Sequence, residues 1–237
     1  MKTLRWRAGQ KWVYRAVALL LPFIYGYWAA VRPLPVLTPA LAATQLSIQT
    51  PAAQLTWPTS GQSAVGIVGS SILATHNAQT PVPTASTAKL ITALVVLREK
   101  PLSLGQQGPI ITLTAADAAL YSSYMAQGGS VVPVVASEQI SEYQMLQAIM
   151  LPSANNMADS LAIWAFGSLH DYNVAATAYL NQLGLTHTHV GSDASGFAPT
   201  TTSTAHDLVR LGELAMQNPV LSQVVGQPTA SGLPLAR

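Results

Sequence analysis

Several stretches of this 237-residue chain carry apolar residues every three or four positions, the spacing of an amphipathic helix. Capping residues and the breakers glycine and proline mark where these stretches begin and end. The pattern predicts helices at 86–98, from 114–117 onward, from 141 to Pro152, and at 155–166, 168–183, 204–216 and 219–225. Two of them, those opening at 114 and 141, begin with capping-box sequences.

Shorter runs of β-branched and aliphatic residues predict strands at 64–68, 72–75, 110–113 and 186–190. The first two flank a Gly-Ser-Ser sequence, which is typical of a β-hairpin. A further run at 131–135 contains Pro133, and proline cannot donate a hydrogen bond to a sheet. A loop or an edge strand is expected there.

The first 43 residues are predicted to form a signal peptide or an N-terminal membrane anchor. Five basic side chains lie in the first 15 residues and precede an uncharged run of 16 residues at 16–31. An Ala-x-Ala cleavage signal follows at 40–42. A transmembrane helix needs about 20 apolar residues, so the sequence leaves cleavage and anchoring open. In both cases the positive N-terminus is expected to stay cytoplasmic while the rest is exported.

Residues 44–63 are rich in proline, threonine, glutamine and serine and are predicted to form a linker, followed by one domain at 64–237. The formal net charge of +2 comes from the N-terminal segment. From residue 43 onward there are five basic and nine acidic side chains, a net charge of −4, so no basic patch for nucleic acid is expected. The absence of cysteine excludes disulfides and thiolate metal sites.

Candidate chemistry begins at Ser86 and Lys89, a Ser-x-x-Lys sequence at the start of the helix predicted at 86–98. Residues three positions apart share one face of a helix, so the two side chains are expected to meet. A serine hydroxyl is a poor nucleophile until a base takes its proton, and lysine does so only when its pKa is lowered. Burial at the positive end of a helix lowers it. The alternative interpretation is that Ser86 only caps the helix.

Ser153, Ala154 and Asn155 form a second motif, Ser-x-Asn, directly after Pro152. Ser-x-x-Lys followed by Ser-x-Asn resembles the motif order of penicillin-binding proteins and class A β-lactamases. The flanking sequence 150–159, with that of 181–190 and the region beyond it, resembles serine D-alanyl-D-alanine carboxypeptidases, the low-molecular-weight penicillin-binding proteins. The resemblance covers roughly residues 60 to 225.

This resemblance implies an α+β fold in which an antiparallel sheet packs with a helical cluster and Ser86 lies at their junction. It also implies acyl transfer. Ser86 would attack the D-Ala-D-Ala carbonyl of a peptidoglycan stem peptide, with Lys89 as the base. Ser153 would relay a proton to the leaving amine, and Asn155 would orient the substrate or the Lys89 amine. Neither a metal nor another cofactor is expected.

The same resemblance implies the partners and the location of the protein. Peptidoglycan stem peptides are the expected substrates, and β-lactams are expected to inhibit by acylating Ser86. An uncleaved N-terminal segment would add contact with the membrane, and no nucleic acid partner is expected. The protein is therefore placed outside the cytoplasm, in the cell envelope or at the membrane.

The third motif of the resembling family, Lys-Thr-Gly on an edge strand, does not occur in these 237 residues. In that family the strand binds the substrate carboxylate and donates one of two oxyanion-hole N–H groups. Loss of one such donor costs about 10²–10³ in rate. We expect the chain to be either a fragment or a natural truncation with impaired chemistry.

Histidines offer weaker candidates. His187 and His189 alternate on the strand predicted at 186–190 and would point the same way, as a metal pair does, but no third ligand is near in sequence. Surface histidines are the preferred interpretation. His206 and Asp207 are interpreted as helix-start residues rather than part of a triad, and Asp193 as a turn residue or a stiffener of its loop.

The sequence therefore predicts an exported serine-type D-Ala-D-Ala carboxypeptidase, with two rivals. A β-lactamase shares the first two motifs, but no glutamate lies between Asn155 and Glu213 to activate a deacylating water in the class A manner. The other rival is a non-catalytic penicillin-binding protein that has lost the third motif.

Overall fold

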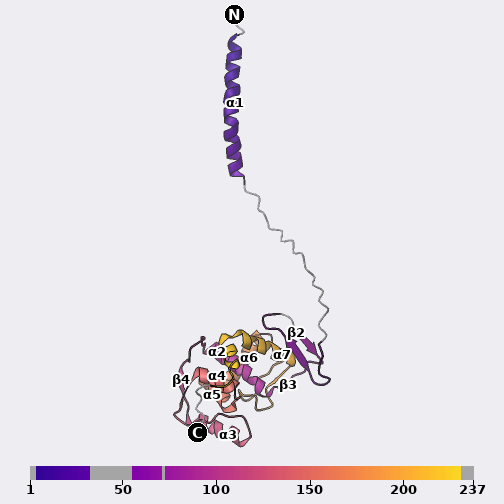
Figure 1. The fold of residues 1–237 in the computed structure, drawn as a ribbon, viewed down its shortest axis with the longest axis vertical. Coiled ribbons are helices and arrows are strands. Elements are labelled where there is room, and N and C mark those ends of the chain that lie inside the picture. Colours follow the sequence, from indigo (N-terminus) through magenta and orange to yellow (C-terminus); the bar gives the residue numbers. More distant parts are fainter. Residues whose placement is uncertain (1–3, 33–54, 71–72, 231–237) are drawn as a thin grey trace. The chain divides into compact units, whose positions relative to one another are not determined.

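The computed structural model describes residues 4–32, 55–70 and 73–230, and the chain divides into two compact units between residues 54 and 55. The first unit contains the helix α1 (Leu4–Val31), drawn in indigo in Figure 1. Its residues Trp12–Val31 are long and apolar enough to cross a membrane, a criterion that signal sequences also meet. The cleavage signal predicted at 40–42 and most of the predicted linker lie outside the described residues.

The second unit carries its strands in antiparallel pairs. The predicted hairpin is confirmed, as β1 (Ser63–Gly66) pairs with β2 (Leu73–His76). The strand β4 (Ile110–Thr112) pairs with β5 (Gln139–Ser141), and β3 (Val82–Pro83) pairs with β6 (Thr202–Ser203). The predicted α+β class is thus confirmed, although within the described residues the strands form three separate pairs.

Helices form the larger part of this unit (Figure 1). They are α2 (Lys89–Glu99), α3 (Ala115–Ala126), α4 (Glu142–Met150), α5 (Asn155–Phe166), α6 (Leu169–Gln182), α7 (Ala205–Gln217) and α8 (Pro219–Val225). The helix α5 contacts α2, α3, α4 and α6, and nine of its twelve residues are buried, so it is the central element of the core. Burial of a large apolar side chain such as Met157 or Leu161 contributes about 1.5–3 kcal/mol.

The helix ends follow the capping signals of the sequence. Both predicted capping boxes are present: Thr114 caps α3 with Asp117, and Ser141 caps α4 with Gln144. The Thr204 side chain accepts the hydrogen bond that caps α7. Side-chain caps of this kind typically stabilise a helix by about 1 kcal/mol each.

Two local predictions are wrong. The segment 186–190 forms a single bridge, His189 to Thr202, in place of a strand. The reason is that the Asp207 carboxylate accepts the His187 N–H at 3.2 Å and the Thr188 hydroxyl at 2.9 Å, so the backbone pairing at His189 does not continue to His187. The α-helix predicted from residue 86 instead starts at Lys89, after a 3-10 turn.

Candidate active site

Ser86 lies in the 3-10 turn η1 (Ala85–Ala88), which joins β3 to α2. The pairing of β3 with β6 fixes the entry to this turn, and the Thr84 N–H donates to the Thr201 carbonyl at 3.0 Å. The side chain of Ser86 is exposed, whereas Lys89 is only 1% exposed. The turn thus presents the hydroxyl to solvent and buries the amine next to it.

The Lys89 amine lies among three acceptors. Its Nζ atom is 3.0 Å from Ser86 Oγ, 2.7 Å from Asn155 Oδ1 and 3.0 Å from the carbonyl oxygen of Ser195. These three contacts match the three protons of an ammonium group. Of these three oxygens, only that of the Ser86 hydroxyl carries a proton. The lone pair of a neutral Lys89 amine can therefore take a proton from Ser86.

Burial lowers the pKa of Lys89 from 10.5 to about 8. The carboxylates of Asp193 and Asp159 act in the opposite direction, because nearby negative charge favours the ammonium form. Burial is the larger effect. An appreciable fraction of the amine is therefore neutral at mildly alkaline pH, which a general base at this position requires.

The second motif lies at the start of α5. Asn155 is the first residue of this helix and is 3% exposed, and its N–H donates to the Ser130 carbonyl at 2.7 Å. Among the described residues, no hydrogen bond joins the Ser153 hydroxyl to Ser86 or Lys89. The structure therefore brings Ser86 and Asn155 to the same amine, and a proton relay through Ser153 stays a prediction.

Two residues beside these side chains have left-handed backbones. Ala85, immediately before Ser86, has a φ of 47°, and Ser153 has a φ of 59°. A residue other than glycine in this region costs on the order of 1 kcal/mol or more. Such strain persists only where the surrounding structure imposes it, and it often marks a functional site.

The loop 193–198 supplies the third acceptor for Lys89. The Asp193 Oδ1 atom accepts hydrogen bonds from Ser195 N–H at 2.8 Å, Ser195 Oγ at 2.6 Å and Phe197 N–H at 3.1 Å. Its Oδ2 atom accepts from the Ala198 N–H at 3.0 Å. Asp193 thus organises the loop whose Ser195 carbonyl contacts the amine, as its loop-stiffening interpretation predicts.

Gly196 lets this loop approach the turn of Ser86 closely. It has a φ of +73°, and a Cβ atom there would clash with the Ala85 carbonyl oxygen and lie 2.6 Å from the Ala88 Cβ. Only glycine combines this backbone conformation with so close an approach.

Sequence reasoning missed Asp159 and Ser195. Asp159 is 2% exposed and lies one turn after Asn155 on α5. A carboxylate among the core positions Met157 and Leu161 was an available signal, because an acidic side chain is rarely buried without a specific partner. The Ser195 contact uses a backbone carbonyl, which no sequence motif encodes.

The histidine candidates lie apart from this cluster. His187 and His189 are exposed, and His206 Nδ1 lies 3.1 Å from Asp207 Oδ1 at the start of α7. Over 4–32, 55–70 and 73–230 there is no group of three histidine, aspartate or glutamate side chains that could hold a metal ion. None of these histidines contacts Ser86 or Lys89 among the described residues.

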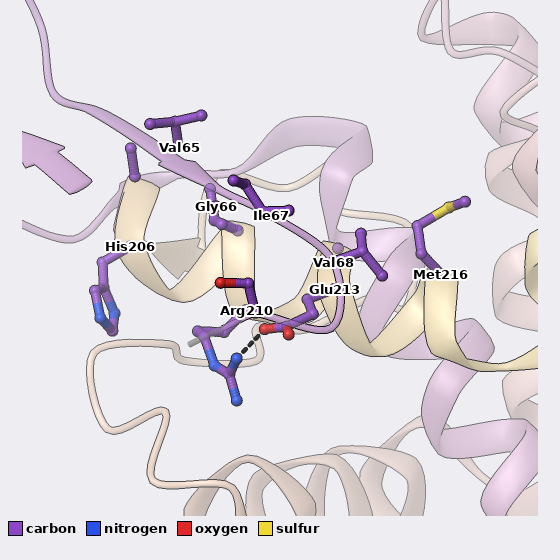
Figure 2. A pocket seen from close by; sticks show the side chains of 12 residues that line it. Val65, Gly66, Ile67, Val68, His206, Arg210, Glu213 and Met216 are labelled. Carbon is purple, nitrogen blue, oxygen red and sulfur yellow. Dashed lines mark hydrogen bonds and ion pairs between the residues drawn. The ribbon is translucent and has the colours of Figure 1, made fainter. Parts of the chain in front are cut away.

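A cavity of about 660 Å³ lies between the β1–β2 hairpin and α7 (Figure 2). Its walls are mostly apolar, with Val65, Ile67 and Met216 among them, and Arg210 forms an ion pair with Glu213 at its side. Ser86, Lys89 and Asn155 do not line it, so this cavity is separate from the candidate catalytic groups.

Comparison with known proteins places this chain in a family. The family described as D-alanyl-D-alanine carboxypeptidase matches residues 59–231. The chain is 33% identical over 162 residues to the D-alanyl-D-alanine carboxypeptidase DacB2 of Mycobacterium tuberculosis, a match covering 67% of this chain and 51% of that protein. It is 34% identical over 153 residues to a D-alanyl-D-alanine endopeptidase of Pseudomonas aeruginosa, covering 64% and 46%. The chain thus spans about half the length of these relatives.

Solved structures show the same fold. A D-alanyl-D-alanine carboxypeptidase of Mycobacterium tuberculosis superposes with a TM-score of 0.62 at 27% identity, covering 75% of this chain and 64% of that one. The Streptomyces K15 DD-transpeptidase also gives 0.62, at 26% identity, covering 73% and 67%. Penicillin-binding protein 6B of Escherichia coli, at 20% identity, shares the fold with a TM-score of 0.64, covering 73% and 55%.

Proposed function

This chain belongs to the D-alanyl-D-alanine carboxypeptidase family, and from that membership we propose that it is a serine-type D-Ala-D-Ala carboxypeptidase acting on peptidoglycan stem peptides. The observation that carries the proposal is the buried Lys89 amine, 3.0 Å from the exposed Ser86 hydroxyl. Ser86 is the nucleophile and Lys89 is its base.

In the acylation step, the neutral Lys89 amine takes the Ser86 proton while Oγ attacks the carbonyl carbon of the penultimate D-alanine. The Ser86 N–H stabilises the resulting oxyanion as one of its donors. The C–N bond then breaks, and the proton held by Lys89 passes through the Ser153 hydroxyl to the departing amine of the terminal D-alanine. Asn155, at 2.7 Å from Nζ, keeps the amine in place throughout.

In the second step, water attacks the acyl-enzyme ester, and Lys89 again takes the proton. Oγ leaves with a proton returned from Lys89, so Ser86 is regenerated and the shortened peptide is released. A β-lactam acylates Ser86 by the same route, but its opened ring stays attached to the acyl group, which slows hydrolysis.

The N-terminal unit supports a location outside the cytoplasm. We infer that α1 acts as an export signal or a membrane anchor, because basic residues precede a helix apolar and long enough to span a membrane. Peptidoglycan, the proposed substrate, lies on the outer side of that membrane.

The test is release of D-alanine from a peptide ending in D-Ala-D-Ala, with a peptide ending in L-Ala-L-Ala as the control substrate and Ser86→Ala as the control variant. We expect release of D-alanine only from the peptide ending in D-Ala-D-Ala and only by the wild type. Hydrolysis of penicillin without D-alanine release would instead identify a β-lactamase. Failure of the folded wild type in both assays would identify a non-catalytic protein.

A further inference from the structure

A buried carboxylate connects α5 to the loop that holds Lys89. Asp159 is 2% exposed, and its Oδ1 atom accepts the Ala194 N–H at 2.8 Å. Its Oδ2 atom accepts the Tyr124 hydroxyl of α3 at 2.6 Å. Asp159 lies four residues after Asn155, so the face of α5 that contacts Lys89 directly also anchors the loop behind it.

The Ala194 backbone is held on both sides. Its N–H donates to Asp159, and its carbonyl accepts the Thr92 hydroxyl of α2 at 2.5 Å. The next residue is Ser195, whose carbonyl oxygen lies 3.0 Å from Lys89 Nζ. Displacement of Ala194 would therefore move an acceptor of the amine. Thr92 lies one turn after Lys89 on the same helix, so α2 and α5 fix this loop together.

Asp159 is also part of the electrostatic surroundings of the amine. The titratable groups around it come from four elements: Lys89 of α2, Tyr124 of α3, Tyr172 of α6 and Asp193 of the loop. Burial raises the pKa of Asp159 to about 6, so the carboxylate is largely ionised at neutral pH. Its charge then favours the protonated form of Lys89.

We propose that Asp159 is a positioning residue of this site, which fixes the Ser195 carbonyl against Lys89 through Ala194 and tunes the protonation of the amine through its charge. The effect of Asp159 on catalysis rests on the proposed function. Its contact with Ala194 and the effect of its charge on Lys89 do not. Nothing in the Ser-x-x-Lys or Ser-x-Asn motif assigns this residue a part.

Lysine NMR tests the link without requiring activity. The chain has only four lysines, at positions 2, 11, 89 and 100, so side-chain ¹³C labelling of lysine in the 237-residue chain in detergent micelles gives few signals. Asp159→Asn keeps an acceptor for the Ala194 N–H and removes the charge. We expect Lys89 to titrate about one pH unit lower in this variant than in the wild type.

The matched control is Asp171→Asn, an exposed carboxylate at the start of α6, which should leave the Lys89 titration unchanged. An unchanged Lys89 midpoint in Asp159→Asn would overturn the proposal. If Asp159→Asn does not fold, a pH titration of the wild type replaces it. The NMR signal of the Ala194 amide, which donates to Asp159, should shift with a midpoint near pH 6. The absence of this shift would overturn the proposal.

Acylation by fluorescent penicillin adds the catalytic readout. Asp159→Asn should move the rise of the acylation rate to lower pH, whereas Asp159→Ala should lower the plateau rate about 10–100-fold. A purely structural role would lower the rate without moving the pH midpoint. If the folded wild type is not acylated, the proposed function fails, and the Lys89 titration still decides the role of Asp159.

Discussion

The Lys89 Nζ atom lies 3.0 Å from the Ser86 hydroxyl oxygen, with the lysine buried and the serine exposed. This arrangement separates two requirements. A substrate must reach the hydroxyl, and the amine must be shielded from water for its pKa to fall. The 3-10 turn before α2 meets both, because it exposes Ser86 and directs Lys89 into the core.

The acylation rate should therefore depend on pH. Lys89 acts as a base only when neutral, and its pKa is lowered to about 8, so the rate should rise about tenfold per unit below that pH and level off above it. Stopped-flow acylation by a chromogenic β-lactam measures this profile. Lys89→Arg, which stays protonated, should lose about 10²–10⁴ in rate. A flat profile from pH 6 to 9 would exclude Lys89 as the base.

Asn155 offers a test of the charge around the amine. Asn155→Asp puts a carboxylate where the amide oxygen now lies 2.7 Å from Nζ, which should raise the pKa of Lys89. The acylation profile should move upward by about one pH unit or more. Asn155→Ala should slow acylation about tenfold without an upward shift, since it removes an acceptor and adds no charge. Identical profiles for the two variants would contradict this reasoning.

Gly196→Ala should damage both stability and activity. The added Cβ clashes with the carbonyl of Ala85, the residue before the nucleophile, and an alanine at this positive φ is strained. We expect a loss of about 2–3 kcal/mol, a fall in Tm of about 5–10 °C, and little acylation of Ser86.

Gly105→Ala is the matched control, because Gly105 has a φ of +80° and nothing within 4 Å of the added Cβ. It should cost only the backbone strain, about 1 kcal/mol. Differential scanning calorimetry compares the two variants. Equal falls in Tm would show that the close approach to Ala85 has no energetic weight.

Much of the fold was predictable because local signals dominate it. The capping boxes at Thr114 and Ser141, and the proline that opens α8, lie where the sequence places them. The segment 186–190 was not predictable from its own residues. Its alternating pattern favours a strand, but the Asp207 carboxylate, 20 residues away in sequence, accepts the His187 N–H that a longer ladder would need.

In the candidate site, too, some residues could be predicted from the sequence and others could not. Ser86, Lys89 and Asn155 were predicted from motifs whose spacing puts them near helix starts, and the structure brings Ser86 Oγ and Asn155 Oδ1 within 3.0 Å of Lys89 Nζ. Ser195 contributes a carbonyl that any residue carries, so composition could not reveal it. Asp159 acts through the backbone of Ala194, a contact 35 residues away in sequence that only the packed fold creates.

Glu142 should make stability fall as pH rises. It is 1% exposed, its Oε1 atom has no hydrogen-bond partner among the described residues, and burial raises its pKa from 4.5 to about 7. Because the folded state holds this proton more tightly than the unfolded state, the stabilisation is complete below about pH 4.5 and is lost as pH rises through 7.

Glu142→Gln mimics the protonated form and should raise Tm by about 2–4 °C at pH 8 while changing it little at pH 4. Glu99→Gln, at an exposed position of α2, is the control and should change neither value. Thermal unfolding at the two pH values compares them. An equal gain in Tm at pH 4 and pH 8 would show that the buried charge of Glu142 is not the cause.

The most direct test of the account is the site at which penicillin attaches. The 237-residue chain is treated with penicillin, digested and analysed by mass spectrometry, alongside Ser86→Ala and Ser153→Ala. The account predicts one adduct on Ser86 in the wild type, none in Ser86→Ala, and a slower adduct on Ser86 in Ser153→Ala. An adduct on another residue, or undiminished labelling of Ser86→Ala, would contradict it.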